Sequence, residues 1–331
     1  MLNLVKEIYP QYVGHSFVSA PDTENDRIKC VQQLVQSMMS KMGIDIGKRK
    51  LALFIEEDPF CVNPKYEYQT DMEYLNIPPL LLFDPNEAPA QFKFNGPNDP
   101  KLNDDKIIQD FANWICRKLD LPKKRITNRD KQAIRLYFKF MQNPEKAKHA
   151  IPFILGHELS HFSNDDGLKG MLIDFLSRLG GIAFSFVLSV VLVIVFSLSS
   201  PAALIFFLTT AFVSYHAIYK VGFCHFFRLQ ERKADEMSVT KLPGVSEGAI
   251  YLFETLRDFQ KEMRNQKSLS LKDRILHRIM IKSNGDNRIC KFTHFTETQR
   301  IKHIQKVMEA AQKNRRNLNC VHLNSYMVQL F

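Results

Sequence analysis

Two long apolar segments dominate the pattern of hydrophobic and polar positions along the chain. Residues 179–198 read LGGIAFSFVLSVVLVIVFSL, 20 residues without a charged side chain, and residues 201–219 contain only His216 as an ionisable group. A helix of that length covers about 30 Å, the thickness of the hydrocarbon core of a bilayer. A short polar turn with a helix-initiating proline, Ser199-Ser200-Pro201, separates the two segments. The pattern predicts a transmembrane hairpin in residues 171–227, with spans at about 179–198 and 201–219.

The alternative interpretation of these segments is a pair of buried core helices in a soluble protein. A helix of a soluble protein usually has a polar face, and the first segment has none. Basic residues flank the two spans and are missing from the turn between them: Lys169 and Arg178 precede the first span, and Lys220, Arg228, Arg232 and Lys233 follow the second. The positive-inside rule then places both flanks, and with them both termini, in the cytoplasm.

Outside the hairpin, the periodicity predicts a mainly helical fold with a few strands. Apolar residues recur at helical spacing in four segments, 104–119, 128–141, 245–265 and 296–314. The last segment is basic and begins with a capping box, Thr296 with Gln299. Residues 50–56 (KLALFIE) and 79–83 (PLLLF) have the composition of short strands, so we expect a small sheet.

The composition excludes few classes of protein but favours a membrane setting. The 331 residues are 45% hydrophobic and 24% charged, which is typical of a folded chain with a buried core. The net charge of +10 could serve nucleic acid, an anionic membrane or an acidic partner. The sequence contains no Cys/His finger and no RNP-type aromatic strand, so we expect the lipid bilayer, and no nucleic acid, as a partner.

The cysteines do not form a metal-binding or disulfide framework in the sequence. Cysteine occurs at six positions, and none of them belongs to a C-x-x-C pair: Cys30, Cys61, Cys116, Cys224, Cys290 and Cys320. A disulfide scaffold is shorter and denser in cysteine. We interpret them as reduced thiols in a cytoplasmic or membrane setting.

A His-Glu-x-x-His motif lies just before the hairpin, from His157 through Glu158 to His161. Two histidines at i and i+4 project from one face of a helix, where their rings can bind one zinc ion. The glutamate beside the first histidine can take the proton of a metal-bound water. The motif predicts His157 and His161 as zinc ligands and Glu158 as the catalytic base. The alternative is a helix with two surface histidines.

The third ligand is expected after the hairpin, because a zinc peptidase site needs three protein ligands and an open position. Glu231 and Asp235 stand at i and i+4 of a predicted helix. Glu231 could bind the metal, and Asp235 could accept a hydrogen bond from the free ring nitrogen of one histidine. Glu231 lies 70 residues after His161, and a hairpin returns the chain to its starting side. The alternative is a charged helical face in which Arg232 and Lys233 neutralise the two acids.

Other candidate ligands are weaker. His225 lies in the apolar run GFCHFF and is interpreted as a membrane-interface residue. His216 lies in the middle of a predicted span, too far from the cytoplasmic face to join the site. Asp165 and Asp166, followed by Gly167, are interpreted as a helix-ending turn.

These residues together carry a resemblance to a known family. HELSHFSNDD, then a membrane hairpin, then ERKAD, resembles the HtpX-like and CAAX-prenyl-protease-like membrane zinc metallopeptidases, which carry HExxH and a downstream ExxxD. The resemblance covers about residues 150–240. It implies a zincin-like α+β domain, mainly helical, with a small β-sheet and an inserted two-helix transmembrane hairpin. It also implies that His157, His161 and Glu231 bind zinc, that Glu158 is the base and that Asp235 orients a ligand.

The family also has a His-Pro pair followed by a spacer and Arg-Ile. We match this pattern to residues 268–275, where Arg274 and Ile275 are kept and Ser268-Leu269 replaces the His-Pro pair. The resemblance therefore suggests Arg274 as a residue that supports the site or the substrate. The departure at Ser268-Leu269 favours the alternative of a membrane protein that keeps the fold without peptidase activity.

The chain is thus expected to have four parts: 1–148 as the N-terminal cytoplasmic part of the peptidase domain, 149–170 as the active-site helix and turn, 171–227 as the hairpin, and 228–331 as the C-terminal cytoplasmic helical part with the third ligand. The predicted function is a zinc metalloendopeptidase, with one Zn²⁺ per chain, that cleaves membrane proteins or peptides at the cytoplasmic face. One alternative is a catalytically inactive membrane adaptor or binding protein that keeps the fold. Another is a soluble lipid-binding protein with a buried hairpin.

Overall fold

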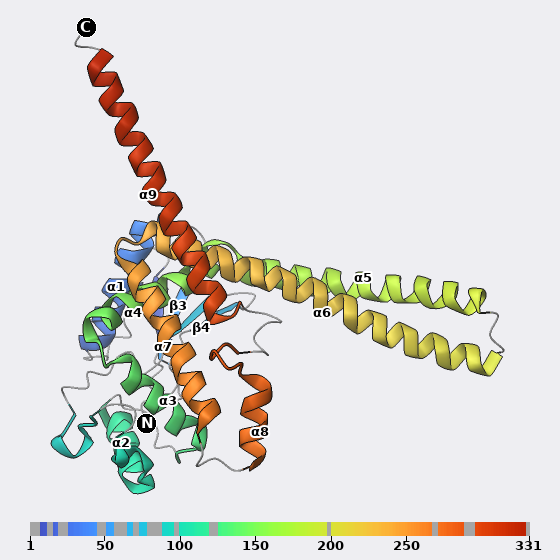
Figure 1. Ribbon diagram of the computed structural model, residues 1–331, viewed down its shortest axis with the longest axis horizontal. Coiled ribbons are helices and arrows are strands. Elements are labelled where there is room, and N and C mark those ends of the chain that lie inside the picture. Colours follow the sequence, from blue (N-terminus) through green and yellow to red (C-terminus); the bar gives the residue numbers. More distant parts are fainter. Residues whose placement is uncertain are drawn as a thin grey trace.

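The computed structural model describes residues 7–11, 16–18, 26–44, 51–55, 65–68, 73–77, 88–95, 99–118, 125–196, 200–266, 271–287 and 295–328. These residues form a body of helices around a small sheet (Figure 1). Two long helices project together from this body, and the last helix extends away from it in a different direction (Figure 1).

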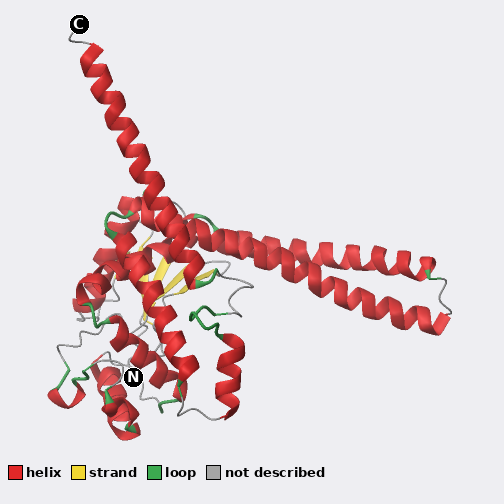
Figure 2. Cartoon of the chain, viewed as in Figure 1, coloured by secondary structure: helices red, strands yellow, loops and turns green. Residues whose placement is uncertain are grey.

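Helices make up most of the described chain (Figure 2). The α-helices are α1 Asp26–Met42, α2 Asp105–Lys118, α3 Asn128–Phe140, α4 Pro144–Ser163, α5 Asp166–Val195, α6 Ser200–Lys241, α7 Val245–Asn265, α8 Leu271–Met280 and α9 Glu297–Val328. Two 3-10 turns, η3 Ala90–Phe92 and η4 Pro100–Asn103, precede α2. The mainly helical fold is confirmed, and α2, α3, α7 and α9 correspond to the four helices that the periodicity predicts.

Five short strands form the sheet in the part of the chain that the structure describes. They are β1 Glu7–Gln11, β2 Ser16–Val18, β3 Leu51–Ile55, β4 Lys65–Tyr68 and β5 Glu73–Ile77, in the order β2-β1-β3-β5-β4. Only β3 and β5 pair in parallel, and β4 at the end of the described sheet contacts α4 and α5. The strand expected at 50–56 corresponds to β3, whereas the one expected at 79–83 lies outside the described residues.

Helix α4 is the centre of the body, and it contacts α1, α5, α6, α7, β4 and β5. Its apolar side chains Phe153, Leu155, Leu159 and Phe162 are buried in the main core. The contact with α7 is close because Gly248 has no side chain: a Cβ there would lie 2.2 Å from the carbonyl carbon of His149. This packing fixes the helix that carries the His-Glu-x-x-His motif.

The hairpin consists of α5 and α6, which pack along each other. Both helices are long and apolar enough to cross a membrane. Small residues lie between them: a Cβ on Gly181 would meet the ring of Tyr215 at 2.9 Å, and the buried Ser189 donates to the carbonyl of Phe207 at 3.2 Å. The large apolar side chains point outward instead and are exposed, among them Phe186, Ile194, Leu204 and Phe212. The soluble-core alternative requires the rest of the protein to bury this surface. The described residues leave it exposed, which argues against that alternative.

The two ends of the hairpin join the body differently. Helix α4 ends at Ser163, and Asn164 and Asp165 form a two-residue break before α5, with Asp165 at a φ of 55°. The turn predicted at Asp165 and Asp166 is thus shorter than expected, because Asp166 already belongs to α5. On the other side, α6 continues without a break from the second apolar segment to Lys241. The proposed third ligand is therefore on the same helix as the second span.

Candidate metal centre

Helix α4 brings the two motif histidines together on one face. An N-terminal cap at Asn143 and a proline in the first turn start the helix, and its buried apolar residues hold it in the core. The Nε2 atoms of His157 and His161 lie 3.1 Å apart, one helical turn from each other. Since both nitrogens point to the same place, the two rings can share one ion.

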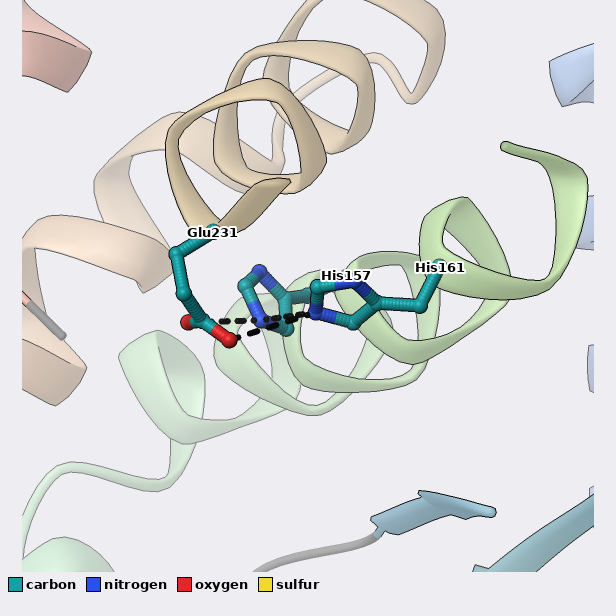
Figure 3. Close-up of side chains that lie close together, drawn as sticks. All are labelled: His157, His161 and Glu231. Carbon is teal, nitrogen blue, oxygen red and sulfur yellow. Dashed lines mark hydrogen bonds and ion pairs between the residues drawn. The ribbon is translucent and has the colours of Figure 1, made fainter. Parts of the chain in front are cut away.

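Glu231 meets the two histidines from α6 (Figure 3). One carboxylate oxygen lies 3.3 Å from Nε2 of His157, and the other lies 3.4 Å from Nε2 of His161. The three ligand atoms are all within 4.8 Å of one another. Segments that are 70 residues apart in the sequence thus supply one cluster of two imidazoles and a carboxylate.

Each histidine also has a carboxylate at its other ring nitrogen. Nδ1 of His157 donates to Asp235 at 2.9 Å, and Nδ1 of His161 donates to Asp166 at 2.8 Å. A proton held on Nδ1 leaves the lone pair of Nε2 available to a metal. Asp235 is the partner that the sequence predicts, whereas Asp166 was assigned only to a turn. His161, like His157, needs a hydrogen-bond acceptor at its Nδ1 atom, and this need is the signal that points to Asp166.

Arg300 on α9 completes the polar cluster. Its guanidinium donates to both carboxylate oxygens of Asp235, from Nε at 2.8 Å and from Nη2. Nη1 lies 3.6 Å from a carboxylate oxygen of Glu231, and the guanidinium is 4.3 Å from the centre of the Phe253 ring. A planar guanidinium suits this bidentate contact, and the aromatic ring covers its face.

Arg274, the residue suggested by the Arg-Ile pattern, lies elsewhere. It belongs to α8, which packs against α7, and among the described residues it has no contact with the cluster. Arg300 and Ile301 fit the same pattern, because His294-Phe295 and a four-residue spacer precede them. This second match keeps the histidine of the pair. The sequence analysis missed this signal, because the chain contains several Arg-Ile pairs and spacing alone did not distinguish the match at Arg300 from the one at Arg274.

The charges around the two rings favour a cation. Burial alone lowers the pKa of His157, but Glu231 and Asp235 outweigh it, so the pKa is raised. At His161, burial is outweighed by Asp166 and Glu231, and the pKa rises to about 10. Burial raises the pKa of Asp235, but the guanidinium of Arg300 together with His157 brings it below its usual value. Asp235 therefore stays ionised and helps to make the centre of the cluster attractive to positive charge.

Glu158, the predicted base, directly follows His157 on α4. Its side chain is half-buried on α4. The Glu158 carboxylate is close enough to His161 and to Arg300 to raise the pKa of both groups. A carboxylate in this position can exchange protons with a group held at the cluster.

The weaker candidate ligands remain apart from the cluster. His216 packs its ring against Phe212 and Tyr215 on α6, with ring centres 4.4 and 5.2 Å apart. His225 is exposed on the same helix. Among the residues that the structure describes, His157, His161 and Glu231 alone form a group of three suited to a metal.

A His-Glu-x-x-His helix with a glutamate from a second helix defines the class of HExxH metallopeptidases. The sequence matches the model of peptidase family M48 over residues 133–308, more than half of the chain, and the chain belongs to this family. It is the family of HtpX-like and CAAX-protease-like metallopeptidases, so the resemblance is confirmed, and membership implies a metal-dependent peptidase. All cluster residues, including Arg300, lie in the matched range. A search of curated proteins and a search of solved structures each gave no match.

Proposed function

We propose that this chain is a membrane-bound zinc metalloendopeptidase in which His157, His161 and Glu231 would hold the zinc. The observation that carries the proposal is the meeting of three ligand atoms from α4 and α6 within 4.8 Å. Two imidazole nitrogens and a carboxylate form a donor set that suits zinc. The carboxylates at both Nδ1 atoms hold a ring proton there, which orients each ring with Nε2 toward the metal position.

The other residues of the cluster have separate roles in peptide hydrolysis. Zinc, when bound, lowers the pKa of its water and polarises the scissile carbonyl. Glu158 removes a proton from the attacking water and delivers it to the leaving nitrogen. Asp235 and Asp166 hold the two histidines in one tautomer and orientation, and Arg300 keeps Asp235 ionised.

The substrates are membrane proteins or peptides that reach the cytoplasmic face. The apolar outer surface of the hairpin and the basic residues at its base support a location in the membrane with the cluster on the cytoplasmic side. Strand β4, at the end of the described sheet, contacts α4 and can pair with an extended peptide. A peptide bound there runs beside the helix that carries Glu158.

The test compares the wild type with Glu158→Gln, both purified in detergent. We expect about one zinc per chain in each protein, and hydrolysis of an unfolded reporter protein about 10²–10⁴-fold slower in the variant, because only the base is lost. Metal content and proteolysis are measured on the same preparations. His161→Ala is the control that loses zinc as well.

The alternative, a catalytically inactive membrane adaptor, predicts that neither the wild type nor Glu158→Gln cleaves the reporter protein. Zinc-loaded wild type that cleaves no reporter, or Glu158→Gln that cleaves at the wild-type rate, overturns the proposed mechanism. The departure at Ser268-Leu269 no longer supports an inactive protein, because Arg300 and Ile301 match the Arg-Ile pattern and Arg300 contacts the cluster.

A further inference from the structure

Helix α8 exposes its apolar side. Leu271, Ile275, Leu276 and Ile279 are 66%, 51%, 47% and 60% exposed. The opposite side packs on α7, where Nδ1 of His277 donates to the carbonyl oxygen of Met263 at 3.2 Å. An amphipathic helix on the surface of a soluble protein turns its apolar face inward. α8 does the reverse, so four aliphatic side chains need another environment.

Basic residues share this outward side. Lys272 and Arg278 are both exposed and lie among the aliphatic residues of α8. A helix that combines an apolar face with lysine or arginine is typical of helices that lie in the interface of an anionic bilayer. There the aliphatic groups enter the boundary between headgroups and acyl chains, while the cations contact the phosphate or carboxylate of the headgroups.

The position of α8 agrees with such a contact. It lies on the side of the body from which α5 and α6 project, and it runs crosswise to them (Figure 1). A bilayer crossed by the hairpin extends across the hairpin axis, so its surface is parallel to α8. Exposed apolar residues continue down α5 toward the body, at Leu168, Met171, Leu172 and Phe175. The apolar surface of the hairpin thus extends down to the body, on the side where α8 lies (Figure 1).

We propose that α8 is a second membrane attachment, which docks flat on the anionic surface of the bilayer that the hairpin crosses. This inference rests on the proposed membrane location of the hairpin and adds a contact that the two spans do not provide. A loop that includes Asp286 connects α8 to α9, and Asp286 accepts hydrogen bonds from the backbone and hydroxyl of Thr298, two residues before Arg300. Docking of α8 therefore holds the metal cluster at a fixed height above the lipid.

The experiment uses tryptophan fluorescence of the full-length protein in lipid vesicles. The only tryptophan, Trp114, is replaced by phenylalanine, and one new tryptophan is introduced at a time. Ile279→Trp reports on α8, Val191→Trp reports on the hairpin, and Lys106→Trp on α2 is an exposed control on the side of the body away from the hairpin. The vesicles contain phosphatidylcholine and phosphatidylserine, with brominated phosphatidylcholine as the quencher.

We expect bromine to quench Ile279→Trp, and its emission to shift to the blue relative to Lys106→Trp. Omission of phosphatidylserine weakens docking by roughly fivefold for each of the two exposed cations, so quenching declines. Ile275→Glu, added to the Ile279→Trp chain, also reduces quenching. Because Ile275 is exposed, this change leaves the packing of the body intact.

The outcomes separate this proposal from the membrane location itself. Quenching of Val191→Trp without quenching of Ile279→Trp above the Lys106→Trp level overturns the docking of α8 and leaves the hairpin in the bilayer. The absence of quenching at Val191→Trp overturns the membrane location, and the attachment of α8 with it. Quenching at Ile279→Trp that is unchanged without phosphatidylserine removes the role of the anionic lipid.

Discussion

The two ends of helix α6 differ in which side chains they expose and which they bury. Toward its N-terminus, large apolar side chains such as Leu204, Ile205 and Phe212 are exposed. Toward its C-terminus, the polar residues Glu231 and Asp235 are 7% and 1% exposed. One continuous helix therefore passes from a region that suits hydrocarbon to a buried polar cluster. The contrast shows that side chains at the apolar end suit an apolar environment outside the described chain, whereas those at the polar end are buried in the protein interior.

The two ends also respond differently to substitution. Each buried acid of the polar end has named partners, so removal of one leaves another charged group buried without compensation. Outward residues of the apolar end have few contacts with the body, and their replacement by another apolar residue changes little. Substitutions at the polar end should therefore have the larger effects, and their order tests the roles assigned to the cluster.

The largest effect is expected from Glu231→Ala. It removes one of three ligand atoms, so zinc bound by the purified protein should fall from about one per chain to a small fraction, and hydrolysis with it. Glu236→Ala on the exposed side of the same helix is the matched control, with zinc unchanged. Equal zinc in Glu231→Ala and wild type would show that another residue supplies the third ligand.

Arg300→Ala should be strongly destabilising. The change leaves the Asp235 carboxylate buried without its cation, which costs about 3–5 kcal/mol in the free energy of unfolding. Arg300→Lys keeps a charge but loses the bidentate geometry, so its cost should be smaller. Denaturant unfolding in detergent measures both, and Arg257→Ala, which removes a more exposed arginine of α7, is the control. If Arg300→Ala unfolds like Arg257→Ala, the guanidinium does not compensate Asp235.

Asp166→Asn should weaken metal binding without abolishing it. Loss of a carboxylate at the second nitrogen of a histidine ligand typically lowers metal affinity about 10–100-fold. Competition with a chelator of known affinity measures the change, and saturating zinc should restore full occupancy of the site. Asp165→Asn is the neighbouring control, since asparagine tolerates the left-handed backbone at that position. Affinities that are equal in both variants exclude a role of Asp166 at His161.

The smallest effect is expected from Asp286→Asn, which should change how the stability of the protein depends on pH under acid conditions. Burial raises the pKa of Asp286, but hydrogen bonds from Thr298 and Asn284, together with Lys282, bring it below the ordinary value of 3.8. A carboxyl whose pKa is lower in the folded state than in the unfolded state stabilises the protein at pH values above the unfolded-state pKa. This stabilisation is lost as the pH falls through the folded-state pKa. Asp286→Asn should cost about 1 kcal/mol at neutral pH and flatten the loss of stability below pH 4. Parallel unfolding curves at all pH values would contradict this assignment.

Local spacing was enough to predict that the two motif histidines lie together and that two long apolar helices follow them. His157 and His161 share a face because of the helical period, and an uninterrupted apolar run is sufficient to define a span. Asp166 was not predictable in this way, because its contact depends on the break at Asn164 and Asp165. Arg300 depends on the return of α9 across α7 and α6, a tertiary contact that no local pattern contains. The order of the strands depends likewise on pairing between distant segments.

The continuity of α6 has a mechanical consequence. Glu231 lies 12 residues beyond Tyr219, the end of the second apolar segment, and no break in the helix separates them. The histidines, in contrast, reach the hairpin only through the two-residue break before α5. In the proposed membrane location, a tilt of the second span to match a thinner or thicker bilayer would be transmitted along about 18 Å of continuous helix to Glu231. The thickness of the bilayer would then affect the distance between Glu231 and the two histidines.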